Sequence, residues 1–431
     1  MFELYLLTFN CARNLVDPQS LAPPLFDALP SDVAVPDIIA VSLQEISPIA
    51  YSFLGGSYLT PYFERVTATV ELAAKLRSHG TERLQHVATR SLGMTALMIF
   101  ARPHVAEKIQ WIQSAGAGVG FWNMGNKGAV AMRLGLSGPS AEDVLQLTFV
   151  GAHLAPMERN IAARNRDWEN IVRNMVFVNE DTSGYSSSET VPLLSSVSVV
   201  PPEDGTGMFS AKNHIFFAGD LNYRTHDTPP GPNAHKSYPQ PVPSDSSPAH
   251  YSHLLTKDQL IREKDANRTL HGFHELPITF PPTYKLSMNS RKDAVEVEDS
   301  SSGDVDRWTW AKHRYPSWCD RILFTLSTPP LQPQIYTALP IQPTSDHRPV
   351  ALSLRVDKHP ITLSTDGDGS KRSPFPINPS WRSRKETARR LEVIVGILSY
   401  LALTKAGNAI VIAVSVAIAA SWWMSTWLSS R

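Results

Sequence analysis

The fold is predicted outward from the stretch Phe216-Phe217-Ala218-Gly219-Asp220-Leu221-Asn222-Tyr223-Arg224. Its two aromatic residues and alanine are typical of the end of a buried strand, and Gly219 allows the backbone to turn. Asp220 and Asn222 lie two positions apart, so on extended backbone their side chains point the same way. A carboxylate and an amide directed at one point can hold a water molecule and a phosphate oxygen. The same pair also forms ordinary turns, so the interpretation depends on the rest of the chain.

The composition suits a large globular protein with one α/β domain or two domains. The chain has 431 residues, ten of them tryptophan, and 42% of its residues are hydrophobic. The formal net charge is zero, which argues against a globally basic nucleic-acid-binding protein. Cys11 and Cys319 are too few for a disulfide framework, so a reducing compartment is expected. The first ten residues lack a basic region and predict a strand instead of a secretory leader.

Apolar runs and amphipathic segments alternate along the first 356 residues, which predicts an α/β domain. Strands are expected at the apolar runs 3–9, 38–43, 94–101, 128–134 and 145–151. Helices are expected at 61–79 and 158–177, where apolar residues have helical spacing. Segments rich in Ser, Pro, Asp or Gly predict partly disordered loops and one linker, at 181–210, 228–248, 287–306 and, for the linker, 359–380.

The C-terminal tail predicts a membrane-spanning helix. Residues 406–428 contain no charged side chain, and a helix of that length spans about 34 Å, enough for a bilayer core. Trp422, Trp423 and Trp427 lie at one end, as in an interfacial belt. The alternative is a buried helix of the globular core, which the position of the segment behind a linker disfavours. Residues 391–403 are also apolar apart from Glu392, and they either extend the anchor or lie in the membrane interface.

Basic residues precede this tail and predict its orientation. Seven of them stand against Glu386 alone, namely Lys371, Arg372, Arg382, Arg384, Lys385, Arg389 and Arg390. This bias predicts that the preceding domain lies on the cytosolic side.

Polar residues stand at the end of almost every expected strand: Asn10, Glu45, His153, Asp220 with Asn222, and Asp346 with His347. In layered α/β folds such strand ends gather into active sites. A Glu with Asn and Asp neighbours suits a hard cation such as Mg²⁺, which takes oxygen ligands. The sequence contains no Cys/His cluster for zinc, no Gly-x-Ser-x-Gly elbow and no Gly-x4-Gly-Lys-Ser/Thr phosphate loop.

Three further motifs supply cations that can bind phosphate: Asn126-Lys127-Gly128, the segment 282–285, and the segment 312–323. Ammonium and guanidinium groups make charge-assisted hydrogen bonds to phosphate oxygens. The alternative for each is an ordinary loop with a solvated charge.

Taken together, these motifs resemble the inositol polyphosphate 5-phosphatases of the endonuclease/exonuclease/phosphatase superfamily. The first family signature, Trp-x-Gly-Asp-x-Asn-Phe/Tyr-Arg-aliphatic, corresponds to 217–225, where Phe217 and Thr225 depart from it. The second, Arg-x-Pro-Ser/Ala-Trp-Cys/Thr-Asp-Arg-Ile, is intact at 314–322. Shorter family motifs follow in family order: Gln44-Glu45, Asn126-Lys127-Gly128, Ala152-His153-Leu154, 164–167, Thr283-Tyr284-Lys285 and 345–349. The resemblance covers roughly residues 3–356.

The resemblance implies an α/β fold of the DNase I type, a four-layer sandwich in which two facing mixed β-sheets are flanked by helices. With the C-terminal transmembrane helix, it implies a small tail-anchored enzyme. We expect a catalytic domain at 1–356, a Pro/Ser-rich and then basic linker at 357–390, and a hydrophobic tail anchor at 391–431 that spans at about 406–428. We also expect a monomer that binds no nucleic acid.

The resemblance further implies Mg²⁺-dependent hydrolysis of a 5-phosphate on an inositol ring. Glu45 would be the principal metal ligand, helped by Asn10. Asp220 would orient or deprotonate the attacking water. Asn222 would hold that water or the scissile phosphate.

Other residues would stabilise charge in the same reaction. His347, oriented by Asp320, would stabilise the charge that develops on the phosphoryl oxygens, with assistance from His153 and Asn126. Asp346 would lie beside the metal or beside Asn222.

Five residues would bind the other phosphates of the substrate: Lys127, Tyr284, Lys285, Arg314 and Arg321. A membrane anchor favours a lipid substrate, so phosphatidylinositol 4,5-bisphosphate at a cytosol-facing membrane, that of the endoplasmic reticulum, is the expected substrate and place. The alternatives are soluble inositol polyphosphates, a phosphodiesterase acting on DNA or sphingomyelin, and an inactive phosphoinositide-binding membrane tether. The second signature disfavours the phosphodiesterase, and the complete set of expected catalytic residues disfavours the tether.

Overall fold

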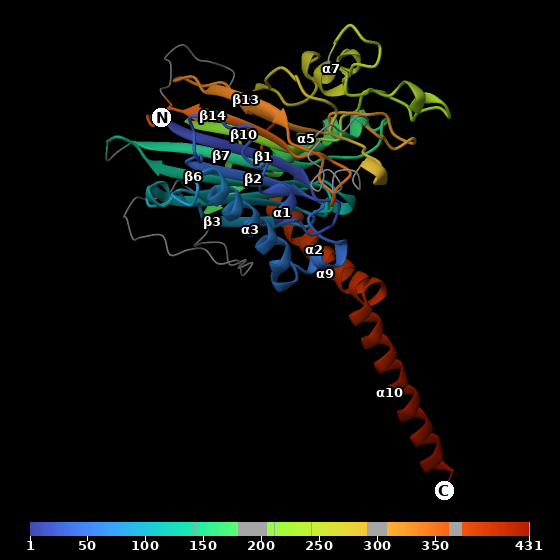
Figure 1. Ribbon diagram of the computed structural model, residues 1–431. Helices are drawn as coiled ribbons and strands as arrows, with labels where there is room; N and C mark the ends of the chain where they lie inside the picture. The colour runs from blue at the N-terminus through green and yellow to red at the C-terminus, as the bar shows by residue number, and fades with distance from the viewer. Residues whose placement is uncertain are drawn as a thin grey trace.

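Two β-sheets stacked face to face form the centre of the fold (Figure 1). The computed structural model describes residues 1–140, 143–179, 205–210, 212–242, 244–290, 308–361 and 373–430. Within these residues the smaller sheet has six strands, in the spatial order β13 (Gln332–Ala338), β14 (Val350–Val356), β1 (Phe2–Asn10), β2 (Ile38–Gln44), β4 (Thr95–Ala101) and β3 (Gln85–Leu92). The larger sheet has eight, in the order β11 (Phe273–His274), β12 (Asp320–Thr325), β10 (Asn213–Asp220), β7 (Val144–His153), β6 (Gly128–Ser137), β5 (Ile109–Gly118), β8 (Val176–Asn179) and β9 (Thr206–Gly207).

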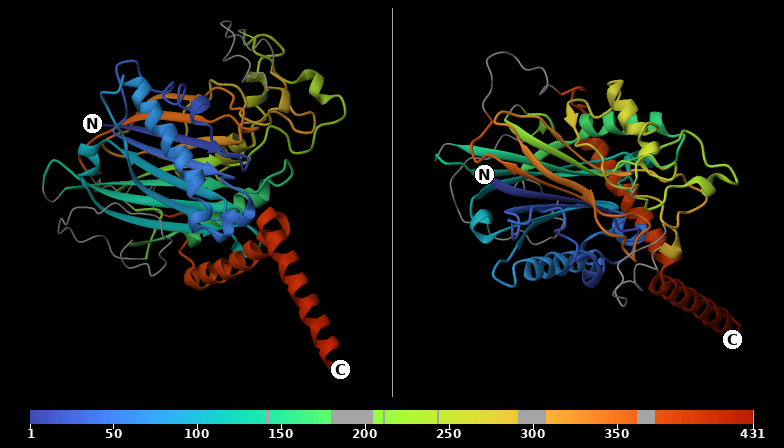
Figure 2. Two further views of the ribbon diagram at one scale, coloured as in Figure 1. Left: turned by 60° about the horizontal axis from the view of Figure 1, so that its bottom comes forward. Right: turned by 45° about the horizontal axis from the view of Figure 1, so that its top comes forward.

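Helices cover the outer faces of both sheets (Figures 1 and 2). The two longest helices of the domain proper are α3 (Thr60–Arg77), over the smaller sheet, and α5 (Ile161–Asn174), over the larger one. The shorter helices are α1 (Pro18–Leu21), α2 (Ile49–Leu54), η1 (Gly56–Tyr58), α4 (Pro103–Ala106), η2 (Phe121–Asn123), η4 (Ala234–Ser237), α6 (Ser252–Leu255) and α7 (Gln259–Asp265). The chain ends in α9 (Trp381–Leu403) and α10 (Lys405–Ser429).

Strand β1 shows how the sequence produces these layers. Its residues Phe2, Leu4 and Leu6 belong to the apolar cluster between the two sheets, together with residues of β7 and β10. The alternate residues Tyr5 and Leu7 belong to a second cluster beneath α1 and α3. Side chains alternate between the faces of a strand, so a strand that is apolar at nearly every position must be covered on both faces. The predicted four-layer sandwich of two mixed sheets between helices is confirmed.

The expected elements agree with the structure at nearly all positions. All five predicted strands are present, and the predicted helix 61–79 is α3. The predicted helix 158–177 is shorter, because Met175 is extended and β8 begins at Val176. The predicted loop 228–248 is irregular apart from η4, with residue 243 outside the described residues. Most of the other predicted loops and of the linker, at 180–204, 291–307 and 362–372, also lies outside the described residues.

The register of the strands brings the polar strand ends together. In the larger sheet, Asp220 of β10 pairs with His153 of β7 on one side and with Asp320 of β12 on the other. His153 in turn pairs with Gly128, the first residue of β6. In the smaller sheet, Asn10 at the end of β1 pairs with Gln44 at the end of β2. Both sheets therefore present their polar ends at the same edge of the sandwich.

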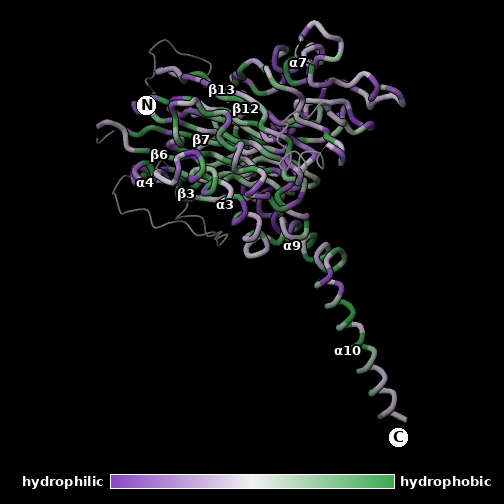
Figure 3. Tube along the Cα trace, in the orientation of Figure 1, coloured by the Kyte–Doolittle hydropathy of each residue, from purple (hydrophilic) through white to green (hydrophobic). Residues whose placement is uncertain are grey.

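The last two helices differ sharply in their contacts. Helix α9 lies against α2 and η2, and it buries Ala388, Glu392 and Gly396. Helix α10 projects from the domain (Figures 1 and 2), and Gly407 is its one buried residue among those described. By length and composition α10 can cross a membrane, and Figure 3 shows its middle in the colour of hydrophobic residues.

The predicted boundary between residues 390 and 391 lies within α9, and the apolar residues 391–403 form the second half of that helix. The division into a catalytic domain, a linker and a tail anchor stays a prediction.

Candidate active site

Asp220 lies at the centre of the strand ends and is 2% exposed. Its Oδ2 accepts a hydrogen bond from Nδ2 of Asn10 at 2.9 Å and lies 3.2 Å from Nε2 of His153. Its Oδ1 accepts a hydrogen bond from the backbone N–H of Asn222 at 3.1 Å. Burial raises the pKa of Asp220, but the hydrogen bond with His153 and the charges of His153, His347 and Lys127 outweigh it and hold this pKa well below its usual range. The carboxylate is therefore an ionised acceptor at the edge where the strand ends of both sheets meet.

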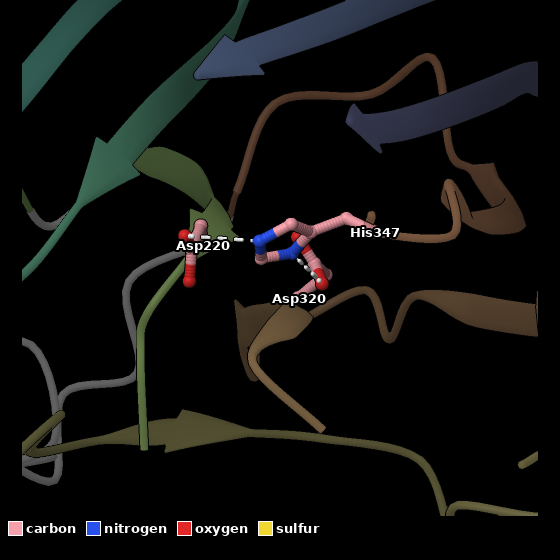
Figure 4. Close-up of side chains that lie close together, drawn as sticks. All are labelled: Asp220, Asp320 and His347. Carbon is pink, nitrogen blue, oxygen red and sulfur yellow. Dashed lines mark hydrogen bonds and ion pairs between the residues drawn. The ribbon is translucent and has the colours of Figure 1, made fainter. Parts of the chain in front are cut away.

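His347 and Asp320 form a buried pair beside Asp220 (Figure 4). Nδ1 of His347 lies 2.9 Å from Oδ2 of Asp320, which also accepts a hydrogen bond from the hydroxyl of Thr283 at 2.6 Å. The other ring nitrogen, Nε2, faces Asp220 at 4.0 Å. Burial lowers the pKa of His347, but the charge and hydrogen bond of Asp320 and the charges of Asp220 and Asp346 raise it to about 9. His347 is therefore an imidazolium at neutral pH, with one N–H directed into the site.

The loop before β14 is attached to the end of β1. The hydroxyl of Ser345 donates to the carbonyl of Asn10 at 2.6 Å and accepts from the backbone N–H of His347 at 3.1 Å. This hydroxyl fixes the backbone of the loop relative to the strand that carries Asn10. The position of His347 is thus set from both sides, by Ser345 at the backbone and by Asp320 at the ring.

Asn222 occupies a bend immediately after β10. Its φ of 58° is in the left-handed region, which asparagine tolerates better than most residues. Its Nδ2 donates to the carbonyl of Leu154 at 3.1 Å, and its Oδ1 accepts from the guanidinium of Arg224. The guanidinium of Arg224 in turn lies 4.4 Å from the centre of the Tyr284 ring. Asn222 therefore joins the bend after β10 to Leu154, the residue after β7, while its backbone N–H orients Asp220.

Glu45 is the most accessible of the predicted acidic residues, with a side chain that is 25% exposed. It follows β2 with a φ of 46°. Its carboxylate lies 3.2 Å from Nε of Arg13 and 3.9 Å from Nζ of Lys127. Asn10 ends the neighbouring strand and pairs with Gln44, the residue before Glu45, and its Oδ1 accepts a hydrogen bond from the backbone N–H of Ala12 at 3.0 Å. These hard oxygen donors fit a small divalent cation, because Mg²⁺ takes oxygen ligands and retains several waters.

A second group also has metal-binding atoms, since one ligand atom each of Asp220, Asp320 and His347 lies within 4.8 Å of the others. Asp320 is fully buried; its Oδ2 already holds His347 and Thr283, whereas its Oδ1 has no hydrogen-bond partner among the described residues. This group and the edge at Glu45 are therefore two candidate metal positions.

Lys127 and His153 connect Glu45 with Asp220. Nζ of Lys127 contacts Nε2 of His153, the same atom that faces Asp220. Burial lowers the pKa of Lys127. The pKa of His153 is also lowered, mainly by burial and secondly by the charge of Lys127. The neighbouring Asn126 has a buried Oδ1 without a hydrogen-bond partner among the described residues. This side of the site therefore holds polar atoms that a bound ligand can engage.

Two of the predicted phosphate-binding residues, Tyr284 and Lys285, lie around the His347 side. The ring of Tyr284 lies 4.4 Å from the ring of His347. Lys285 forms an ion pair with Asp346, whose pKa is raised by burial but lowered overall by the charge of His347 and the hydrogen bond from Lys285. Arg314 is farther out, 3.8 Å from the carboxylate of Glu158.

Arg321 lies elsewhere. It is fully buried, donates to both carboxylate oxygens of Asp258 at 3.0 and 3.1 Å, and donates to Glu275 at 2.7 and 2.6 Å. Arg321 follows Asp320 in β12, and consecutive residues of a strand point to opposite faces. Since Asp320 reaches the site, Arg321 points to the other face, towards the beginning of α7. This placement does not fit the predicted phosphate-binding role.

Comparison with known proteins identifies the family. The model of endonuclease/exonuclease/phosphatase family 2 matches residues 7–353. The chain belongs to this family. It is 29% identical over 285 residues to phosphatidylinositol 3,4,5-trisphosphate 5-phosphatase 1 of Xenopus laevis, a match that covers 65% of this chain and 24% of that protein. It is 26% identical over 321 residues to a polyphosphatidylinositol phosphatase of Saccharomyces cerevisiae, covering 74% of this chain and 24% of that protein.

The chain is also 30% identical over 257 residues to inositol-1,4,5-trisphosphate 5-phosphatase 1 of Schizosaccharomyces pombe, with 59% of this chain and 18% of that protein covered. The chain thus spans about a quarter or less of the length of these relatives. Among solved structures, the inositol polyphosphate 5-phosphatase domain of SPsynaptojanin, in complex with inositol 1,4-bisphosphate and calcium, is similar in fold. Its TM-score is 0.57 at 21% identity, over 91% of this chain and 89% of that one.

Some residues of this family member's site were not assigned a role from the sequence. Arg224, Thr283 and Ser345 hold Asn222, Asp320 and the backbone of His347, respectively. All three lie inside the motifs that carry the resemblance, so their motif positions were the available signal. Their partners are distant in sequence, which is why the spacing alone did not indicate what they bind.

Proposed function

We propose that the chain is a metal-dependent phosphomonoesterase that removes the 5-phosphate of phosphatidylinositol 4,5-bisphosphate at a cytosol-facing membrane. The observation that carries the proposal is the meeting of the ionised Asp220 with the imidazolium of His347 at the joined edges of two sheets. An anionic acceptor beside a fixed cationic donor suits the attack of water on a phosphate monoester. Three relatives whose names state 5-phosphatase or phosphoinositide phosphatase activity support the choice of reaction.

Asp220 and His347 have opposite parts in the proposed reaction. Asp220 accepts a hydrogen bond from the attacking water and orients it towards phosphorus. As the water oxygen bonds to phosphorus, the bond between phosphorus and the ring oxygen at position 5 breaks, and a proton from the water ends on that oxygen, which gives the free hydroxyl and inorganic phosphate. His347 directs its Nε2–H at a phosphoryl oxygen, where negative charge increases in the transition state. Asp320 holds the ring through Nδ1, so that the donor is already oriented before reaction. His153 and Asn126 contribute further polar contacts, and Asn222 holds the water or the scissile phosphate.

The proposed metal is Mg²⁺, held by Glu45 and Asn10. When bound, it neutralises charge on the phosphoryl oxygens and polarises the phosphorus for attack. The solved domain of similar fold carries calcium, a cation with the same preference for oxygen ligands. Asn10 also donates to Asp220, so the residue that would hold the metal also orients the residue that holds water.

Four cations and a phenol would select the substrate. Lys127 lies on the Asp220 side, whereas Tyr284 and Lys285 lie on the His347 side, and Arg314 lies beside Glu158. Arg224, which contacts the Tyr284 ring, would support that side. Such an arrangement suits a ring with several phosphates, since each charge-assisted hydrogen bond adds to binding.

The proposals of a lipid substrate and of a membrane location depend on the C-terminal helix α10. Helix α10 has 25 residues, and its apolar stretch is not buried against the domain, so it suits a bilayer. The basic residues before it favour a cytosolic domain. We propose that the chain is a monomer and that it is anchored in the endoplasmic reticulum, because the anchor is moderately hydrophobic and its basic residues lie mostly upstream. Soluble inositol polyphosphates are the second candidate substrates, because one relative is named an inositol-1,4,5-trisphosphate 5-phosphatase.

One assay tests the function and separates the two candidates. Phosphate release would be measured from phosphatidylinositol 4,5-bisphosphate in vesicles, from inositol 1,4,5-trisphosphate and from abasic DNA, each with and without Mg²⁺. We expect Mg²⁺-dependent release that is fastest from the lipid. Faster release from the soluble compound would favour the second candidate, and no release from any phosphate ester would contradict the function.

A further inference from the structure

Helix α9 is attached to the domain by a narrow stripe of side chains. Ala388, Glu392 and Gly396 recur every four residues and are the buried residues of this helix. At Gly396 the backbones approach closely, because a Cβ there would lie 3.1 Å from Cβ of Phe53 and 3.2 Å from the backbone nitrogen of Leu54. The helix therefore packs tightly on α2, the helix that follows the Glu45 loop.

Glu392 is an unusual residue for such a stripe, because it is a carboxylate that is 2% exposed. Its Oε1 accepts a hydrogen bond of 2.7 Å from the backbone N–H of Gly125, and its Oε2 lies 3.4 Å from Nη1 of Arg389. Arg389 also donates to the carbonyl of Phe53 at 2.7 Å. A buried carboxylate is costly unless it is paired and hydrogen-bonded. The nearer of its two hydrogen-bond donors is a backbone amide of the domain, 267 positions away in the sequence.

Gly125 connects this contact to the active site. The next two residues are Asn126 and Lys127, and Lys127 contacts His153 and lies 3.9 Å from Glu45. The carbonyl of Gly125 accepts from the N–H of Met94 at 3.0 Å. The carbonyl of Met94 accepts from the N–H of Ile46 at 3.3 Å, and Ile46 directly follows Glu45.

A chain of three hydrogen bonds thus leads from α9 through Gly125 and Met94 to Ile46, the residue after Glu45. Little of it can move independently. A Cβ on Gly125 would lie 2.9 Å from the backbone nitrogen of Gly93 and from the carbonyl carbon of Leu92, so the loop is held at backbone contact. A displacement of Gly125 must therefore also displace Asn126 or Met94.

We propose that Glu392 is a positioning residue for the reaction: it fixes Gly125 and thereby sets the positions of Asn126, Lys127 and the Glu45 loop. Helix α9 is then part of the catalytic unit as well as the connection to the tail. The inference rests on the proposed function for its kinetic consequence. Displacements of about 1 Å in groups that hold a substrate can lower rates by about a hundredfold, so a distant carboxylate can matter to turnover.

Four variants of the full-length protein in detergent test the inference. Glu392→Ala removes the acceptor of the Gly125 N–H, whereas Glu392→Gln retains an oxygen that can accept it. Gly396→Leu moves the helix away without touching the carboxylate. Glu386→Ala is the matched control, because Glu386 is an exposed glutamate on the same helix. The measurements are kcat and KM on a soluble short-chain substrate, and amide hydrogen exchange of the segment 118–128.

We expect Glu392→Ala and Gly396→Leu to lower kcat by about tenfold or more and to speed exchange in 118–128, while exchange in β7 and β10 stays as in the wild type. Glu392→Gln should keep most of the turnover, and Glu386→Ala should be indistinguishable from the wild type.

Two results would overturn the inference: unchanged kcat and exchange in a folded Glu392→Ala protein, or a uniform rise in exchange across the domain, which is the result of general destabilisation. A wild type without phosphatase activity would contradict the proposed function. In that case the exchange of 118–128 would still test the positioning role.

Discussion

The ring of His347 and the carboxylate of Asp320 are joined by a hydrogen bond of 2.9 Å between Nδ1 and Oδ2. The two residues come from different parts of the sandwich, since Asp320 begins β12 of the larger sheet and His347 precedes β14 of the smaller one. The pair therefore exists only when both sheets are stacked in register. Its charge state depends on the same stacking, because Asp320, Asp220 and Asp346 together raise the pKa of His347 against the effect of burial.

The first prediction concerns pH. Since the pKa of His347 is raised from 6.5 to about 9, the imidazolium persists through neutral pH, and kcat should decline as the pH rises through about 9. Asp320→Asn should shift this alkaline limb to lower pH, because it removes the charge that raises the pKa. The same ion pair should stabilise the fold fully below about 6.5 and cease to do so above about 9. The pH profile of kcat and thermal unfolding between these values are the measurements, and an alkaline limb unmoved by Asp320→Asn would contradict the assignment.

The second prediction concerns Asp220. Asp220→Ala should lower turnover by ~10²–10⁴-fold, the range for loss of a group that handles protons or stabilises charge. Folding should be retained, which circular dichroism and thermal unfolding can check. Asp245→Asn is the matched control, because that carboxylate is exposed. Turnover within threefold of the wild type would remove Asp220 from the mechanism.

The third prediction concerns the metal. Glu45→Gln keeps the shape of the side chain but removes the charge that would attract Mg²⁺, so the Mg²⁺ concentration for half-maximal activity should rise by about tenfold or more. Calorimetric titration of the protein with Mg²⁺ provides a readout that does not depend on turnover. Glu64→Gln, on the exposed side of α3, is the control. An unaltered titration would show that Glu45 is not a ligand.

The fourth prediction concerns the reading of the inositol ring. Lys285 belongs to the group around His347, so Lys285→Ala should weaken activity on substrates with a 4-phosphate more than on those without one. A charge-assisted hydrogen bond contributes about 1.5–3 kcal/mol, which corresponds to roughly tenfold or more in kcat/KM. Kinetics on phosphatidylinositol 4,5-bisphosphate and phosphatidylinositol 5-phosphate would measure the difference. Equal losses on both would indicate a general electrostatic role.

The fifth prediction concerns Arg321, the nearby cation with a structural placement. Arg321→Ala should lower the free energy of unfolding by about 3–5 kcal/mol, because it leaves Asp258 and Glu275 as buried charges without their partner. Any folded fraction should retain the substrate preference of the wild type. Urea unfolding is the measurement, and an altered preference for the 4-phosphate at unchanged stability would restore a substrate-binding role.

Much of this fold can be predicted from the sequence because nearly every core strand is apolar on both faces. The run around Leu4 and Leu6 indicates a doubly covered strand, and such strands imply layers. The positions of Asn10, His153 and Asp220 at strand ends also follow from the sequence, since each directly ends an apolar run. What the runs cannot supply is the register that places these ends opposite one another, because pairing partners lie far apart in the chain.

The errors and omissions have equally specific causes. The family motif predicts a place in the site for Arg321, although the alternation that directs Asp320 into the site directs Arg321 out of it. The hydropathy pattern marks Glu392 only as a charged residue in an apolar segment, because it reports composition and not which atom a carboxylate contacts. Its partner is a backbone amide of Gly125, and backbone donors carry no sequence signal.

The junction of α9 and α10 has a mechanical consequence. Thr404 is the one residue between the two helices, its hydroxyl accepts from the N–H of Gly407 at 2.9 Å, and a Cβ on Gly407 would lie 2.0 Å from the carbonyl oxygen of Tyr400. Because α9 is itself fastened to the domain, the connection contains no slack. If α10 spans a bilayer, the domain has no flexible linker that would let it reach an apposed membrane. It would act only on lipids that diffuse laterally beneath it, so the substrate would have to travel to the enzyme within a single membrane.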